Sequence, residues 1–359
     1  MDHNNDNARS DLASTLLDRE SEVVHRSDVS NLLAGRRVLV TGAAGSIGSE
    51  LARQTHALGA DVYFLDCDES RLHALKLQIT GGGLLDDPSV VLADIRDRGR
   101  IRQVFAAIRP EVVFHAAAHK HLPLLERYPS EGVKTNVLGT ENLVLAAIAA
   151  EVGRFILVST DKAADPTSVL GATKRLAENL VTLHSRCAST RFASVRFGNV
   201  LGSRGSLLDT LRHQIANGLT VSITDPDVER YFMTIPEAVG LVLEASAMAE
   251  RGETYVLDMG EPIRIVELVE RYAAYVGAPN PTIEYVGLRD GEKLSEALFS
   301  DDEARTATTS ERIWKTEQYT PGALFRHQLA ALYSAAADAD DDYVRHLLAR
   351  LTTKLIVAA

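Results

Sequence analysis

The sequence predicts an α/β fold: a Rossmann-like, doubly wound parallel sheet with a smaller C-terminal substrate-binding lobe. From residue 37 onward, near-continuous apolar strands alternate with helical stretches, a pattern typical of a parallel sheet covered on both faces. A glycine-rich turn follows the first strand directly. After about residue 203 the alternation becomes irregular, which indicates a separate lobe, although 254–260 has the pattern of one returning strand.

The predicted elements fall into four segments. Residues 1–35 are expected to form an N-terminal tail and a helical or wrapping lead-in, and residues 36–202 the Rossmann domain. Residues 203–320 are expected to form the smaller lobe, and the Ala/Leu-rich residues 321–359 terminal helices. The strands predicted for the Rossmann domain are 37–42, 61–66, 89–94, 111–118, 154–161 and 193–200.

Composition narrows the classes of function. The 359 residues are 45% hydrophobic and 24% charged, an ordinary soluble composition, with a formal net charge of −11. That charge argues against a nucleic-acid binder and an anionic-membrane binder, so an anionic ligand needs local basic residues. Cys67 and Cys187 lack metal-like spacing and fit a reducing compartment. Without a signal-peptide pattern or an apolar run near ~20 residues, we expect a cytoplasmic protein with no membrane insertion.

The first strand ends in a turn with the spacing Gly-x-x-Gly-x-x-Gly, which opens a helix. Such a turn lets backbone N–H groups and the positive helix end approach a pyrophosphate. Asp66 ends the second strand 18 residues after Gly48, where a carboxylate can accept both adenosine ribose hydroxyls and favours NAD over NADP. A cofactor-free Rossmann-like scaffold is the alternative. The predicted NAD contacts are Gly42, Gly45, Ser46, Ile47, Gly48, Asp66, Asp94 and Ile95 beside adenine, Ala116 and Ala117.

Three histidines, His115, His119 and His121, crowd the end of the fourth strand. Imidazoles at four-residue spacing can share a metal ion on a helix, but no nearby carboxylate or cysteine completes a ligand set. We therefore predict no metal site, and expect Lys120 and His121 to line the cleft. Glu126 is either a substrate contact or a solvated charge at a helix end.

Polar and basic residues follow the later strands, several of them in glycine-rich turns. Most arginines of an acidic protein pair with surface acids, which is the alternative for each one. Glycine lets the chain approach a ligand closely, however, and a fork of arginine donors suits phosphates. The residues predicted to bind a nucleotide diphosphate are Arg196, Asn199, Arg204, Arg230, Arg289 and Lys293.

The segment after the fifth strand carries an unusual set of proton-transfer groups. A short-chain dehydrogenase/reductase usually has Tyr-x-x-x-Lys at this place, one helical turn apart on one face. Here Lys174 is present, but Leu170 occupies the tyrosine position. Asp161 and Lys162 instead stand side by side after a buried strand, which disfavours a simple surface ion pair. The exchange predicts a site for elimination as well as hydride transfer.

Eight runs of this sequence, taken together, resemble the nucleotide-sugar 4,6-dehydratases of polysaccharide biosynthesis. These enzymes are an extended short-chain dehydrogenase/reductase group acting on UDP-N-acetylglucosamine. The resemblance spans roughly residues 37–300, and the lead-in is similar to the linker of the large, membrane-anchored members. Those members usually carry methionine at the position of Leu170. The matching runs are VTGAAGSIGSEL, HAAAHKHLPLLE, TNVLGT, STDKAADPTSVLGATKR, RFGNVLGSRGSLL, RYFMTIPEA, YVLDMGEP and GLRDGEKLSE.

The resemblance implies the catalytic part of that branch, without its membrane helices. It implies NAD-dependent 4,6-dehydration of a UDP-sugar, with UDP-N-acetylglucosamine giving UDP-2-acetamido-2,6-dideoxy-4-keto-hexose with retained C5 configuration. By the same resemblance, Thr160 contacts the C4 hydroxyl, Asp161 is the acid and Lys162 the base. Lys174 orders the nicotinamide ribose, and the protein is expected to form a homo-oligomer.

Several positions depart from the branch. It usually has Asn at Ser168, His at Asp225, Thr at Glu229 and Pro at Asp290. Three of these departures add negative charge near the expected nucleotide-sugar lobe, so they bear on the substrate more than on the reaction. The base for the C4 hydroxyl stays open because of Leu170. The alternatives are a UDP-sugar 4-epimerase or dehydrogenase, a dehydratase acting on another nucleotide sugar, and a non-catalytic NAD-binding protein.

Overall fold

A large, mostly parallel sheet forms the centre of the protein. The computed structural model describes residues 12–20, 27–83, 85–316, 321–322 and 324–352, and within them one sheet has nine strands. The fold class predicted from the sequence is confirmed. The strands, in spatial order, are β3 (Val90–Leu92), β2 (Asp61–Asp66), β1 (Arg37–Thr41), β4 (Val112–His115), β5 (Arg154–Val158), β6 (Arg191–Arg196), β11 (Glu253–Leu257), β15 (Ile313–Thr316) and β14 (Thr306–Ala307).

The strand order sets the position of the ligand crevice. From β3 to β11 neighbouring strands pair in parallel, and β15 and β14 add an antiparallel edge. The chain winds outward from β1 toward β3, then returns to continue from β4 on the other side. Ligands of such sheets bind beyond the carboxyl ends of the strands, where the order reverses. The crevice is therefore expected beyond β1 and β4.

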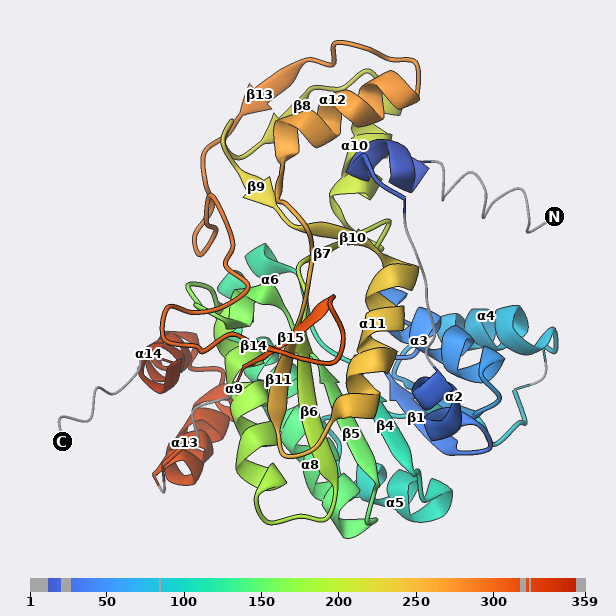
Figure 1. The fold of residues 1–359 in the computed structure, drawn as a ribbon. Helices are drawn as coiled ribbons and strands as arrows, with labels where there is room; N and C mark the ends of the chain where they lie inside the picture. Colours follow the sequence, from blue (N-terminus) through green and yellow to red (C-terminus); the bar gives the residue numbers. More distant parts are fainter. Residues whose placement is uncertain (1–11, 21–26, 84, 317–320, 323, 353–359) are drawn as a thin grey trace.

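Helices cover both faces of the sheet (Figure 1). One hydrophobic cluster joins the sheet to α2 (Ser27–Leu33), α3 (Ser46–Ala57), α4 (Glu69–Thr80) and α11 (Ile235–Met248). A second cluster, on the other face, involves α5 (Arg98–Ile108), α8 (Gly139–Ala149) and α9 (Val169–Ser185). Strands buried on both faces explain the near-continuous apolar runs in the sequence.

Helix α9 is buried along almost its whole length. One side packs on the sheet, and the C-terminal helices α13 (Phe325–Ala337) and α14 (Asp341–Thr352) cover another side through a third hydrophobic cluster. The helical C-terminal segment predicted from the sequence thus shields the helix that carries Leu170 and Lys174. Among the described residues, no helix is long and apolar enough to cross a bilayer.

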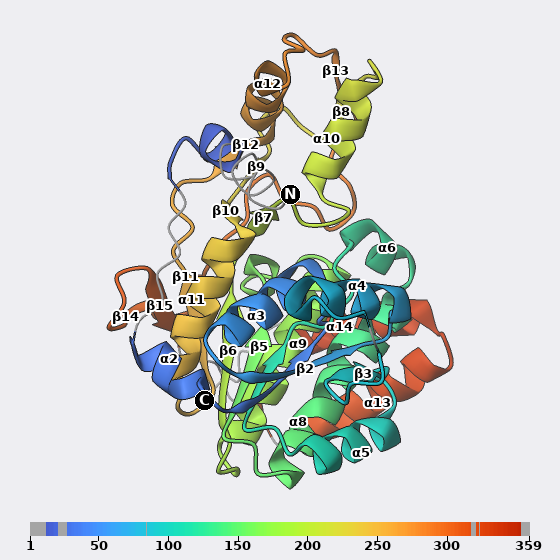
Figure 2. The same ribbon diagram turned by 90° about the vertical axis from the view of Figure 1, so that its right-hand side faces the viewer.

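A smaller lobe lies beyond one end of the sheet (Figure 2). It contains α10 (Leu207–Ala216) and α12 (Ile265–Tyr275), and its hydrophobic cluster also includes Leu16 and Leu17 of the helical residues 12–17. Short strand pairs complete it, namely β8 (Val221–Ile223) with β13 (Ile283–Tyr285), β9 (Glu229–Arg230) with β12 (Ile263–Arg264), and β7 (Asn199–Leu201) with β10 (Phe232–Thr234).

The lobe is smaller than the segment 203–320 that the sequence predicted for it. Helix α11 leaves the lobe and packs on α3, and strands β14 and β15 belong to the main sheet. Strand β11 also belongs to the main sheet, and it lies where the sequence predicted a returning strand near 254–260. Strands β14 and β15 are short and half polar, so they carry no apolar run that marks them. The predicted strand 193–200 is divided at Phe197 and Gly198 into β6 and β7. Within the predicted N-terminal tail and lead-in of residues 1–35, residues 12–17 and Ser27–Leu33 are helical, and residues 1–11 and 21–26 lie outside the described residues.

Candidate functional site

The glycine-rich turn between β1 and α3 is shaped for close approach. Gly42 has φ +66°, and a Cβ there lies 2.5 Å from the backbone N of Ala117. A Cβ on Gly48 lies 2.0 Å from the Gly42 carbonyl oxygen. Gly45 caps α3 without any side-chain hydrogen bond, which leaves the first N–H groups of the helix to an external acceptor. This geometry fits the pyrophosphate of a dinucleotide.

Two carboxylates follow the neighbouring strands at the same edge. Asp66 Oδ2 accepts from Ala44 N (3.0 Å) and Oδ1 from Asp68 N (3.1 Å), so this side chain also fixes the turn. Burial raises the pKa of Asp94, but hydrogen bonds from Arg96 outweigh it and the net pKa is lowered. Ile95 is buried beneath Gly139. The predicted ribose and adenine contacts therefore follow the neighbouring strands β2 and β3 at one edge of the sheet.

His115 does not line this crevice. Its ring lies in the core, with Nδ1 2.8 Å from Thr41 Oγ1 and Nε2 2.9 Å from Thr140 Oγ1. The Thr140 hydroxyl donates to the Asn136 carbonyl, so it accepts from His115 Nε2, and Nδ1 accepts from Thr41. Burial lowers the pKa of His115 to about 3, with the charge of Lys174 adding to the effect, so the ring is neutral.

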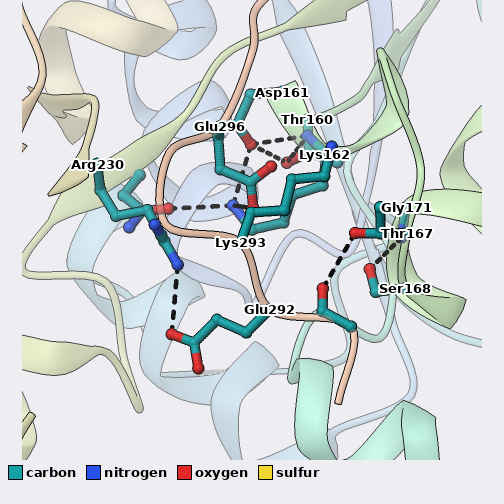
Figure 3. Close-up of polar contacts among 12 residues, drawn as sticks. Thr160, Asp161, Lys162, Thr167, Ser168, Gly171, Arg230, Glu292, Lys293 and Glu296 are labelled. Atoms are coloured by element: carbon teal, nitrogen blue, oxygen red, sulfur yellow. Dashed lines mark hydrogen bonds and ion pairs between the residues drawn. The ribbon is translucent and has the colours of Figure 1, made fainter. Parts of the chain in front are cut away.

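The strongest concentration of reactive groups follows β5. Asp161 Oδ1 accepts hydrogen bonds from Thr160 Oγ1 (2.8 Å) and from Lys162 Nζ (3.0 Å), as Figure 3 shows. Asp161 is 1% exposed, and its Oδ2 has no hydrogen-bond partner within the described part of the chain. A buried, unpartnered carboxylate oxygen is costly and therefore indicates a site that a ligand completes.

A second carboxylate, which the sequence analysis did not single out, lies on the other side of Lys162. Glu296 is 5% exposed, and its Oε1 is 3.7 Å from Lys162 Nζ (Figure 3). Asn199 Oδ1 lies 3.5 Å from the same ammonium. Gly198 keeps the space before Asp161 open, because a Cβ there lies 3.0 Å from Oδ2. Lys162 is thus held between two carboxylates at the end of the sheet.

Lys174 is separate from this cluster. It is buried on α9, and its Nζ donates to the carbonyl oxygen of Val158 at the end of β5 (2.6 Å). Burial lowers its pKa to about 8, although Glu178 opposes the effect. Leu170, one turn earlier, packs in the hydrophobic cluster beneath α13 and α14. Leu170 therefore contributes packing where the usual pattern places a phenol.

The predicted phosphate-binding residues lie in two groups. In the first, a loop of the lobe lies against the segment after β5: Arg230 pairs with Glu292 (3.2 Å), and Lys293 Nζ donates to Asp165 Oδ2 (2.9 Å) (Figure 3). The backbone N of Arg289 donates to Glu292, and Arg289 itself is exposed. In the second group, Lys120, His121 and Arg204 lie together at the glycine-rich turn.

Arg196 cannot bind a phosphate from its position, contrary to the prediction. Its side chain is fully buried, with Nε and Nη2 donating to both oxygens of Glu178 at 2.8 and 2.7 Å. Nη1 donates to Glu303 at 2.6 Å, and Ser159 also donates to Glu178. Residue spacing along a strand does not show which arginine points inward, so the burial of Arg196 could not be predicted from its position in the sequence.

Asn136 is a buried residue beside the site that the sequence analysis did not single out. Its Oδ1 accepts from His119 N (2.8 Å), and its Nδ2 donates to the His119 carbonyl (3.0 Å) and to Thr173 Oγ1 (3.1 Å). This side chain ties the exit of β4 to α9. The available signals were the runs TNVLGT and GLRDGEKLSE, which contain Asn136 and Glu296.

Several known proteins are similar to this chain in sequence and in fold. A family model described as polysaccharide biosynthesis protein matches residues 38–318. The capsular polysaccharide biosynthesis protein CapD of Staphylococcus aureus is 42% identical over 306 residues, 84% of this chain and 51% of that protein. The UDP-glucose 4-epimerase of Rickettsia rickettsii is 31% identical, over 77% of this chain and 81% of that protein. The chain spans about half the length of the first curated relatives it matches.

Solved structures of other proteins have a similar fold. Pen from Bacillus thuringiensis has a TM-score of 0.72 and 31% identity, covering 82% of this chain and 90% of that one. The dTDP-glucose 4,6-dehydratase DesIV from Streptomyces venezuelae, solved with NAD, shares the fold with a TM-score of 0.64 and 24% identity, covering 74% and 88% of the two chains.

The strand order and the glycine-rich turn after β1 define a Rossmann-like fold, which this chain shares with solved nucleotide-sugar epimerases and dehydratases. More particularly, the chain belongs to the polysaccharide biosynthesis protein family.

Proposed function

We propose that the protein catalyses NAD-dependent 4,6-dehydration of a UDP-sugar, with UDP-N-acetylglucosamine as the first candidate and C5 configuration retained. The observation that carries this proposal is the Asp161–Lys162 pair at the carboxyl end of β5, together with Leu170 in the tyrosine position. An enzyme that only moves a hydride needs no acid and base beside each other at the sugar. Elimination of water needs both at once.

The crevice residues fit NAD. The glycine-rich turn leaves no room for a Cβ at Gly42 or Gly48, and Asp66 stands at the end of β2 for the adenosine ribose. Bound NAD would supply the hydride chemistry that links oxidation at sugar C4 to reduction at C6. Solved proteins of this fold carry NAD, which supports the same choice here.

Asp161 and Lys162 can account for every proton if Lys162 is a free amine when the sugar binds. The Asp161 carboxylate takes the C4 hydroxyl proton through Thr160, whose Oγ1 already donates to Oδ1 at 2.8 Å. Lys162 then removes C5–H, and the protonated Asp161 gives its proton to the C6 oxygen, which leaves as water. Lys162 finally returns a proton to C5. The pair ends as it began, and one base acting on one face retains the configuration.

Arg230 and Lys293 are proposed to hold the nucleotide diphosphate, with Arg289, Asn199 and His121 at the rim. Arg230 is buried and pairs with Glu292, while Lys293 reaches the segment after β5. The predicted homo-oligomer stays a prediction.

A UDP-sugar 4-epimerase is the second candidate, because a relative at 31% identity has that activity in its name. An epimerase returns the hydride to C4 and leaves C6 oxygenated. The two reactions therefore differ in one product signal, a C6 methyl group.

Incubation with UDP-N-acetylglucosamine in heavy water, followed by NMR, separates the candidates. Dehydration gives a C6 methyl and deuterium at C5 with retained configuration. Lys162→Ala should abolish C5 exchange while NAD and UDP still bind, and Asp161→Asn should lower turnover about 100- to 10,000-fold. A C4 epimer without the methyl, or near-normal turnover of Lys162→Ala, would contradict the proposal.

A further inference from the structure

Two cations meet at the glycine-rich turn. Arg204 lies in the loop between β7 and α10, where its backbone N donates to Ser46 Oγ (3.0 Å) and its guanidinium donates to the Ala44 carbonyl. Lys120, which follows β4, donates to the Arg204 carbonyl (2.8 Å) and is 3.4 Å from Ser203 Oγ. A loop of the lobe is therefore fixed onto the turn that faces the cofactor crevice.

The geometry of this loop depends on Gly205. It has φ +65°, and a Cβ there lies 2.9 Å from His121 Cε1. The loop thus packs closely against the exit of β4. Arg204 is consequently held at the turn from two sides, by the contacts with Ala44 and Ser46 and by the packing at His121.

The charges of this arrangement are unbalanced. Burial lowers the pKa of Lys120, and the neighbouring positive charge of Arg204 lowers it further. Asp209 opposes this effect, but its Oδ2 accepts from Gly205 N (2.7 Å). Residues 42–48 contain no lysine or arginine, so the turn itself offers an anion only backbone dipoles. Two like charges held together are unfavourable until an anion joins them.

The Arg204 guanidinium also makes few hydrogen bonds among the described residues. Within the described ranges its polar partner is the Ala44 carbonyl, so most of its N–H donors are open. A guanidinium with open donors beside a helix N-terminus matches the oxygens of a phosphate. A phosphate held at this place would belong to the ligand of the glycine-rich turn.

We propose that Arg204, with Lys120 beside it, binds the pyrophosphate of the dinucleotide cofactor and not the diphosphate of the sugar nucleotide. This inference rests on the proposed use of NAD. It leaves the sugar nucleotide to the second basic group around Arg230, which lies in the lobe. The lobe loop thereby lines a further side of the cofactor site. Its contact with the pyrophosphate retains NAD through the catalytic cycle.

The test compares two variants and two ligands. NAD retained by purified protein is measured after gel filtration, and ADP-ribose and UDP are titrated by calorimetry into nucleotide-stripped protein. Arg204→Ala should weaken ADP-ribose binding about 10- to 100-fold and shed NAD, while the UDP affinity changes less than about twofold. Arg230→Ala, the matched control, should show the reverse pattern.

Arg204→Lys should fall between wild type and alanine, because it keeps the charge but loses the fork of donors. It also covers the case in which the alanine variant fails to fold. Unchanged ADP-ribose affinity in Arg204→Ala would overturn the inference, and a selective loss of UDP would assign Arg204 to the substrate. NAD retention and the two ligand affinities are measured without turnover. They therefore decide the role of Arg204 even if the dehydration assay fails.

Discussion

Replacing Arg196 by methionine should destabilise the protein strongly without weakening UDP binding. The side chain is fully buried and bonds two carboxylates, Glu178 and Glu303. Methionine keeps the apolar volume but leaves two buried acids with one fewer cation. Breaking a buried ion pair from one side costs about 3–5 kcal/mol, and we expect the lower end because Arg175 still bonds Glu303 at 2.6 Å.

The pH dependence gives an independent estimate. Burial alone raises the pKa of Glu303, but the bonds from Arg196 and Arg175 lower it from 4.5 to about 2. At about 1.4 kcal/mol for each pH unit, this corresponds to about 3 kcal/mol. Because the folded-state pKa is the lower one, this stability is present above pH 4.5 and is lost as the pH falls toward 2. Wild type should therefore lose more stability than Arg196→Met between pH 5 and 3.

Urea unfolding followed by fluorescence of Trp314, the one tryptophan of the sequence, measures the difference. Trp314 lies on β15, in the same sheet as β6. Arg264→Met is the control, because Arg264 and Glu267 form an exposed pair, and exposed pairs contribute little to stability. A loss below about 1 kcal/mol at Arg196, combined with weaker UDP binding, would refute the structural role and restore the phosphate-binding one.

Three further predictions concern the site. Gly48→Ala should remove NAD from the purified protein, since its Cβ lies 2.0 Å from the Gly42 carbonyl; the nucleotide content after acid release measures this. The pKa of Lys174 is about 8 in the folded protein, against 10.5 in the unfolded chain. Below pH 8 the buried charge therefore lowers the free energy of unfolding, and this loss disappears as the pH rises toward 10.5. Unfolding of the nucleotide-free protein should show wild type gaining up to about 3 kcal/mol over Lys174→Met across that range. Glu296→Gln should slow C5 exchange while NAD and UDP affinities stay unchanged in calorimetry, and a normal exchange rate would remove Glu296 from the site.

The parts of the fold that sequence predicts are those with strong local signals. Strands β1, β2, β4 and β5 are buried on both faces, so each forms an unbroken apolar run. Strand β15 pairs antiparallel with β11 and with the edge strand β14 after a long excursion through the lobe, and the sequences of β14 and β15 are short and mixed. Nothing in such a segment distinguishes an edge strand from a loop, because the partner strand supplies the order.

The candidate site divides in the same way. Thr160, Asp161 and Lys162 are consecutive, and the glycines of the turn are close in sequence, so spacing alone brings them together. Glu296 reaches Lys162 only because a loop of the lobe folds back over the end of β5. Arg204 reaches Ser46 in the same manner. Contacts between distant segments depend on the packing of the lobe, which the local pattern does not describe.

Leu170 shows how the chemistry and the packing fit together. A tyrosine at this position normally shares proton transfer with the lysine one turn later. In this protein the leucine is 6% exposed within the cluster that seats α13 and α14, so its place on α9 serves the core. Lys174 keeps its own place and bonds the end of β5. In the proposed function, the proton-transfer groups lie at the strand end and not on the helix, because Thr160, Asp161 and Lys162 are in bonding contact there. A base and an acid that touch each other suit an elimination better than a lone phenol, because the two proton movements occur on neighbouring carbons of one sugar.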